Sequence, residues 1–121
     1  MIERLEGFAD NICAFVCHEH VTQEDYATVL IPAVEAALRN HDTVRLYYET
    51  AADFKGMDPN AVWQDTMIGK SHLLSWDRLV VVTDIEWIKH TVQIFGFLMP
   101  AQLRVFPLSE SARARRWISE D

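Results

Sequence analysis

Apolar residues along the chain follow two patterns that alternate from one end to the other. Short runs, either continuous or with every second residue apolar, predict strands. Longer stretches with apolar residues spaced three and four apart predict amphipathic helices. The predicted strands cover residues 2–5, 12–17, 43–49, 79–83 and 103–106, and the predicted helices cover residues 22–38, 58–74, 85–99 and 109–118.

This order of elements predicts an α/β fold. The nearly continuous apolar runs at residues 12–17 and 79–82 are typical of strands that helices bury on both faces of a parallel sheet. The short connection between the first two strands favours an antiparallel hairpin. We therefore expect a five-stranded mixed, mostly parallel sheet with four main helices, in the order β-β-α-β-α-β-α-β-α. The last four strands should be parallel, and the first should lie antiparallel at or near an edge.

Capping signals mark the helix starts. Thr22 can cap the first helix, with Asp25 three residues later as a weak form of the capping box. Asp58, followed by proline at the first helical position, marks the second helix. Asp84 can accept hydrogen bonds from the turn that opens the third helix. Pro32 removes the backbone N–H that would bond to Thr28 inside the first helix, so we expect a kink there.

Length and cysteine usage indicate one reduced domain. The 121 residues, half of them hydrophobic, can bury roughly two-thirds of the unfolded surface as one domain over residues 1–121. Cys13 and Cys17 lie in one predicted strand, about 13 Å apart, whereas a disulfide needs Cα atoms roughly 4.4–6.8 Å apart. The chain begins without an apolar leader, and no run approaches about 18 apolar residues. We therefore expect a cytoplasmic protein.

The excess of acidic over basic residues argues against two classes of binding partner. Eleven basic and 18 acidic side chains give a net charge of −7. This balance argues against a nucleic-acid-binding protein, whose affinity depends on neutralising phosphates. It also argues against membrane docking through a basic patch, although not against docking by apolar insertion.

Candidate catalytic and metal-binding residues are few. His18 and His20 stand two apart at a predicted strand end, so both imidazoles should point to one face, and zinc sites use this spacing. No third ligand can be placed, and we favour a solvated strand terminus while leaving a metal open. The sequence contains no Gly-x-Ser-x-Gly elbow, glycine-rich phosphate loop or His-Glu-x-x-His motif. Aspartates near helix starts are more often caps than catalysts, so we expect no enzyme and no cofactor.

The third predicted helix carries two apolar stripes, where covering a sheet needs only one. The first stripe contains Ile85, Ile88, Val92, Phe95 and Met99, and the second contains Trp87, Thr91, Ile94 and Leu98, widened by Phe97. The second stripe has to bury against a neighbouring element, a partner chain, a lipid or a membrane surface. Burial against the second helix through Trp63, Met67 and Leu74 is an equally good interpretation of the pattern.

A series of short motifs in this order and spacing resembles the SpoIIAA-like family within the STAS superfamily. The motifs are Ile2-Glu3-Arg4, Val21-Thr22…Asp25-Tyr26, Val29-Leu30-Ile31-Pro32-Ala33, Asp53-Phe54-Lys55-Gly56, Trp63…Asp65, Gly69…His72, Trp76-Asp77-Arg78, Val81-Val82-Thr83-Asp84…Trp87, Arg104-Val105-Phe106 and Ala114…Trp117. The resemblance implies a small, non-catalytic α/β domain that binds partners or small ligands. It also suggests a likeness to CRAL-TRIO carriers, whose ligands are apolar.

The chain departs from the family pattern at two places. STAS anti-anti-sigma factors carry a phosphorylated Asp-Ser pair at the start of the second helix, but residues 52–58 contain no serine here, and the nearest hydroxyl is that of Thr50. We therefore expect no stable phosphorylation in this loop. Family members carry glycine just before the first helix, where this chain has His20, and a positive φ would be strained with that residue.

These observations predict a binding module with its site in a groove between the second and third helices, near residues 53–58. The expected ligand-binding residues are Asp53, Phe54, Trp63, Met67, Lys70, His72, Trp87, Ile94, Phe97 and Leu98. Asp53, Lys70 and His72 would orient a polar head, and the others would form apolar walls. The expected ligand is an apolar or amphiphilic small molecule, with peripheral membrane contact and a homodimer left open. The alternatives are a protein-interaction module of the signalling type and, least favoured, a hydrolytic or transfer enzyme built on the aspartates.

Overall fold

A computed structural model describes residues 1–58, 75–98 and 101–120, with the backbone alone for residues 95, 97 and 98. Its main sheet is built from β1 (Ile2–Arg4), β2 (Ile12–Cys17), β4 (Val44–Thr50), β6 (Trp76–Val82) and β7 (Gln102–Phe106), in the order β1-β2-β4-β6-β7. β2, β4, β6 and β7 are parallel, and β1 pairs antiparallel with β2 at the edge. The predicted mixed sheet, its edge strand and its hairpin are all confirmed.

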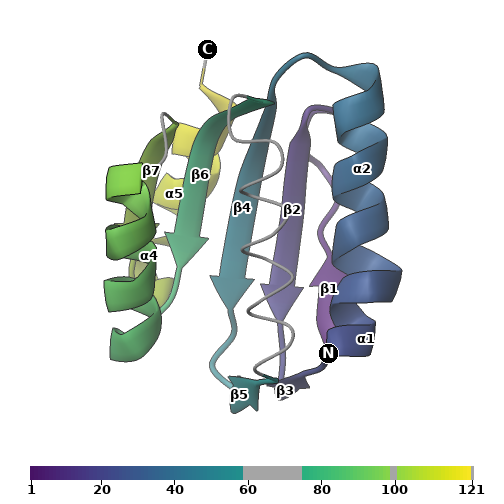
Figure 1. Cartoon of the computed structure of the whole chain (residues 1–121). Helices are drawn as coiled ribbons and strands as arrows, with labels where there is room; N and C mark the ends of the chain where they lie inside the picture. Colours follow the sequence, from purple (N-terminus) through teal and green to yellow (C-terminus); the bar gives the residue numbers. More distant parts are fainter. Residues whose placement is uncertain (59–74, 99–100, 121) are drawn as a thin grey trace.

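Helices cover both faces of this sheet, as expected for parallel strands joined by crossovers. They are α1 (Gln23–Asp25), the π-helical η1 (Tyr26–Leu30), α2 (Ile31–Asn40), α4 (Glu86–Leu98), the 3-10 turn η3 (Leu108–Glu110) and α5 (Ser111–Ser119). Figure 1 shows α1, α2 and α4 over one face and α5 over the other. The predicted helix over residues 58–74 lies outside the described residues, apart from Asp58. No helix in the described ranges is long and apolar enough to cross a membrane.

The first helix begins as its sequence predicts. Thr22 Oγ1 accepts from the Asp25 backbone N–H at 3.1 Å, and Asp25 Oδ2 accepts from the Thr22 N–H at 2.8 Å, which completes the capping box. Burial alone would raise the pKa of Asp25, but the hydrogen bonds from Thr22 lower it below its ordinary value. Just before Pro32, where a kink is predicted, the helix takes the form of the π-helical stretch η1, and the Ile31 N–H donates to Tyr26 O. Such π-bulges are one way to insert a proline into a helix.

Two cores lie on opposite faces of the sheet because neighbouring strand residues point to opposite sides. The larger core, beneath α1, η1, α2 and α4, includes Phe15, Tyr26, Val34, Tyr48, Leu79 and Ile88. The smaller core, beneath α5, includes Ile12, Ala14, Tyr47, Val80, Trp117 and Ile118. Cys13 and Cys17 are free and buried in the larger core, as predicted. Burial raises the pKa of Cys13 to about 11, so this thiol stays protonated.

A second, two-stranded sheet joins β3 (His20–Val21) in parallel to β5 (Gly56–Met57). The turn residues in 53–58 predict a loop, and this prediction is wrong for Gly56 and Met57, which form β5. Each strand is too short to show an apolar period, so its sequence gives no sign of the pairing. The small sheet joins the chain that follows β2 to the chain that follows β4, at the carboxyl ends of these strands.

Candidate functional site

The candidate site lies where the parallel strands β2, β4 and β6 end, the edge at which open α/β sheets place ligands. Figure 1 shows β3 and β5 beyond the ends of β2 and β4, at one end of the molecule. Backbone hydrogen bonds fasten the two loops there. The Glu19 N–H donates to Asp53 O at 3.2 Å, and the Lys55 N–H donates to Glu19 O at 2.7 Å. The Asp58 N–H donates to Val21 O at 2.8 Å, so the loops are held together as one unit.

Two histidine–aspartate pairs reinforce this backbone connection. His18 Nδ1 lies 2.9 Å from Asp53 Oδ1, and His20 Nε2 lies 2.6 Å from Asp58 Oδ1. The hydrogen bond from His20 is the main cause that lowers the pKa of Asp58 below its ordinary value. Asp58 is therefore ionised at neutral pH and engaged by its histidine, which favours a role in fastening the loops over a role as a free base.

The two histidines do not continue one strand, which corrects the prediction that their rings share a face. β2 ends at Cys17, and Glu19 adopts a left-handed backbone with φ of 52°, so the alternation breaks before His20 begins β3. The positive φ considered for His20 falls instead on Glu19. Within residues 1–58, 75–98 and 101–120, no group of three or more His, Cys, Asp or Glu side chains is placed to hold a metal ion.

The hydroxyl nearest to the loop after β4 is buried. Thr50 ends β4 with 1% of its surface exposed, and its Oγ1 lies 2.6 Å from Thr83 Oγ1. Thr83 Oγ1 also accepts from the Ile85 backbone N–H at 3.1 Å. The two threonines therefore connect the ends of β4 and β6 to the residue that precedes α4. A kinase could reach Thr50 only after the strand end opened. This geometry supports the expectation that the loop carries no phosphorylation switch.

Asp84, predicted to accept hydrogen bonds from the turn that follows it, has a different partner. Its Oδ1 accepts from the Leu108 backbone N–H at 3.1 Å. The carboxylate therefore links the end of β6 to η3, which follows β7 in the chain. Side chains near strand ends often bond to whichever backbone donor the topology brings close, and sequence spacing alone does not show that donor.

The outer face of α4 exposes large apolar side chains at this end of the molecule and further along the helix. Ile88 is 6% exposed, and Ile85 and Val92 pack partly buried against the same larger core, so the first predicted stripe faces the sheet. Trp87 and Ile94, from the second stripe, are 49% and 65% exposed. The helix therefore carries more apolar surface than its contact with the sheet uses.

The other predicted site residues divide into two groups. Asp53 is exposed beside His18, and Phe54 packs partly buried against the larger core. The remaining members lie outside the described residues, either entirely or as side chains: Trp63, Met67, Lys70, His72, Phe97 and Leu98. The groove between the second and third helices therefore stays a prediction.

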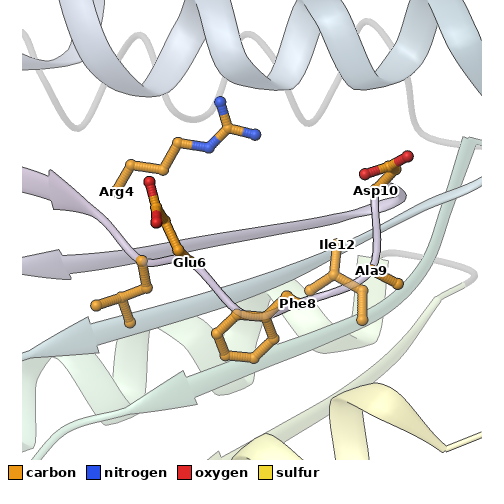
Figure 2. Close-up of a pocket in the computed structure, with 7 residues that line it drawn as sticks. Arg4, Glu6, Phe8, Ala9, Asp10 and Ile12 are labelled. Atoms are coloured by element: carbon orange, nitrogen blue, oxygen red, sulfur yellow. The ribbon is translucent and has the colours of Figure 1, made fainter.

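A pocket of about 250 Å³, which the sequence did not predict, lies at the turn between β1 and β2. Its lining residues are Arg4, Leu5, Glu6, Phe8, Ala9, Asp10 and Ile12. Figure 2 shows the charged groups of Arg4, Glu6 and Asp10 above the apolar side chains of Phe8 and Ile12. Because this turn precedes β2, the pocket lies at the edge opposite the candidate site. A turn gives no pattern of apolar spacing, so sequence reasoning had no signal for it.

Comparison with known proteins finds a matching family model and solved structures with a similar fold. The family model described as SpoIIAA-like matches residues 12–119. Among solved structures, an uncharacterised protein of the DUF3478 family with a SpoIIAA-like fold, from Shewanella loihica PV-4, is 21% identical in sequence. The similarity covers 98% of this chain and 92% of that chain, with a TM-score of 0.72, and at this identity it shows the fold alone. A search of curated proteins found no match.

Proposed function

Because the chain belongs to the SpoIIAA-like family, whose members are generally non-catalytic, we propose that it acts by binding and that the outer face of α4 binds an apolar or amphiphilic molecule. The family and the STAS-type fold support a regulatory or binding module in general. The choice of ligand class and surface is our inference from the side chains of α4.

The exposure of Trp87 and Ile94 carries this proposal. These residues are seven positions apart, which is about two helical turns, so they lie along one side of the helix. Ile88 and Val92 already provide the contact with the sheet. Covering the exposed part of Trp87 or Ile94 would contribute about 1–2 kcal/mol each, which is enough to favour a ligand with apolar surface.

Polar groups for the head of an amphiphile are available at the same end of the molecule as the first turn of α4. Asp53 is exposed and ionisable, and its partner His18 lies between two carboxylates, with Nδ1 2.9 Å from Asp53 Oδ1 and Nε2 3.4 Å from Glu3 Oε1. We propose that these groups, with the predicted Lys70 and His72, orient the polar end of the ligand. A net charge of −7 disfavours adhesion to an anionic membrane, so we favour a single bound amphiphile over docking on a lipid surface.

The test combines binding with stability. We would titrate the environment-sensitive dye 1-anilinonaphthalene-8-sulfonate and a labelled fatty acid into the wild type and into the double variant Trp87→Ser/Ile94→Ser. The double variant should lose binding while its free energy of unfolding changes by no more than about 1 kcal/mol. Gln93→Ser, an exposed change on the same helix, serves as the control and should keep binding. A collapsed melting temperature in the double variant would show that the stripe is core, and unchanged binding would also overturn the proposal.

A protein partner is the second candidate, and the identity of the exposed residue favours it. Tryptophan is enriched among the residues that dominate protein–protein binding energies, and Trp87 stands on a helix that a partner groove could accept. In this case wild-type protein would bind neither probe, and the double variant would change the oligomeric state or the affinity for a protein partner. We expect such binding to be independent of phosphorylation, because Thr50 is buried. Intact-mass analysis after incubation with a cognate anti-sigma kinase should show no gain of about 80 Da on residues 50–60.

A further inference from the structure

Arginine side chains gather around α5, on the face of the sheet opposite α4. Six of the eleven basic residues of the chain lie on this helix or against it: Arg45, Arg78, Arg104, Arg113, Arg115 and Arg116. The segment Ser111–Ser119 contains three of them and no acidic residue. In a chain with a net charge of −7, this helix therefore has a charge of opposite sign to the molecule as a whole.

Two of these arginines are used by the fold. Arg45 Nη1 donates to Ile118 O at 2.8 Å, and Arg78 Nη1 donates to Trp117 O at 2.9 Å and to Glu120 O at 3.1 Å. Their guanidinium groups satisfy carbonyls at the C-terminal end of α5 and complement its dipole. We therefore do not count Arg45 and Arg78 among the groups available to a partner.

Aromatic rings position two more guanidinium groups at the surface. The Arg104 guanidinium carbon lies 4.9 Å from the ring centroid of Phe106 and 5.4 Å from that of Trp117, and that of Arg113 lies 5.8 Å from Phe106. Both rings are buried, so the arginines cover them. A guanidinium group stacked on a ring uses its flat face and leaves its N–H edge free to donate to an anion.

Few carboxylates of the described residues form ion pairs with the exposed arginines of this face. Arg113 forms an ion pair with Glu110, whereas Arg104 and Arg116 form no ion pair with a carboxylate of residues 1–58, 75–98 or 101–120. Arg116 lies one helical turn from Arg113 and is exposed. We use the term arginine surface for Arg104, Arg113 and Arg116. Ring contacts hold Arg104 and Arg113, and no carboxylate of the described residues forms an ion pair with Arg104 or Arg116.

We propose that the arginine surface binds a short acidic segment of a partner protein. The forked N–H groups of arginine match carboxylates in a bidentate geometry. Nucleic acid fits less well, because the rings of Phe106 and Trp117 are covered and cannot stack on bases. A long polyanion or an anionic membrane would also meet the acidic remainder of the molecule, whereas a short segment lies within roughly one Debye length, about 8 Å, of the positive face. This surface is separate from α4 and does not depend on the function proposed for that helix.

Fluorescence anisotropy with a labelled hexaglutamate peptide tests this inference. The wild type should bind the peptide with an affinity that falls as salt rises, and Arg104→Gln/Arg116→Gln should weaken binding roughly ten-fold. The matched control is Arg39→Gln/Lys55→Gln, which removes the same net charge from exposed residues elsewhere and should change the affinity less than two-fold. If Arg104→Gln lowers the melting temperature, the single variant Arg116→Glu provides the same test without disturbing the ring contacts.

Three results would overturn the proposal. The first is no measurable binding of the peptide by the wild type at low salt. The second is an equal loss of affinity in the control variant, which would show a net-charge effect alone. The third is tighter binding of single-stranded DNA of matched charge, or of vesicles containing phosphatidylserine, than of the peptide.

Discussion

The helices α4 and α5 cover opposite faces of one sheet, and they are attached to it by different means. α4 docks through Ile88 and its neighbours and still exposes Trp87 and Ile94. α5 buries its larger apolar side chains, Trp117 and Ile118, and is also held by arginines from the sheet. α4 has apolar side chains that do not contact the sheet, whereas α5 is attached by apolar contacts and by hydrogen bonds. The exposed apolar side chains of α4 are the feature from which we propose a binding face, because the contact of this helix with the sheet does not use them.

The largest expected difference in stability is between substitutions of the buried Trp117 on α5 and of the half-exposed Trp87 on α4. Trp117→Ala should destabilise the protein by about 3–5 kcal/mol, because the ring is 9% exposed and fills the smaller core. Trp87→Ala should cost less than about 1 kcal/mol, since half of its surface is already in water. Urea unfolding followed by circular dichroism measures both values. Equal losses would remove the contrast between the helices.

Substitutions on the two faces of α4 should also differ in their effect on stability, by a smaller amount. Ile88→Ala should lower the free energy of unfolding by about 3 kcal/mol, because this side chain is buried against the sheet. Ile94→Ala should change it by no more than about 0.5 kcal/mol. The pair has identical chemistry, so each variant is the control for the other in thermal and urea melts. A large loss from Ile94→Ala would mean that its side of α4 is packed.

The attachment of α5 can be tested through Arg45. Arg45→Met keeps the apolar stem but removes the donor to Ile118 O and the ion pair with Asp77, whose Oδ2 lies 2.9 Å from Arg45 Nε. We expect a loss of about 2 kcal/mol, the scale of a hydrogen bond that involves a charged group. Arg39→Met, an exposed change on α2, should be nearly neutral in the same urea titration. If the Arg45 variant were as stable as wild type, apolar contacts alone would hold α5.

The smallest effect is expected outside both helices, where histidine–aspartate pairs hold the loops. The pKa of Asp58 is lowered in the folded state, so its contribution to stability is complete above the unfolded value near 3.8 and is lost as pH falls through the lower folded value. Asp58→Asn removes this contribution at neutral pH and reduces the loss of stability on acidification. Urea midpoints at pH 7 and pH 3 should therefore differ less in the variant than in the wild type. An unchanged difference would show that the pair does not stabilise the fold.

Apolar spacing was sufficient to predict the main sheet and the helices that the structure describes. The spacing also separated the stripe of Ile88, which is buried, from the stripe of Trp87, but it left open whether the second stripe packs against another element. The contacts that sequence spacing missed are long-range and polar. Arg45 reaches a backbone carbonyl 73 residues away, and His20 pairs with Asp58 across 38 residues. Such partners are determined by tertiary topology, and a backbone acceptor leaves no signal in the residue type.

Part of the candidate site was also predictable from apolar spacing. Trp87 and Ile94 belong to a periodic pattern, which the sequence shows directly. The pairing of Asp53 with His18 depends on the left-handed turn at Glu19, which no motif in the sequence indicated. The roles of Lys70 and His72 remain predictions from the pattern of the second helix.

The central claim is that α4 carries a binding face for an apolar or amphiphilic molecule. Native mass spectrometry of the protein purified from its own host tests it most directly, because one spectrum reports both retained small molecules and oligomeric state. The account predicts an added mass of a few hundred daltons that organic extraction releases and that the Trp87→Ser/Ile94→Ser variant lacks. A spectrum of the bare chain, or of the chain bound only to another protein, would contradict it.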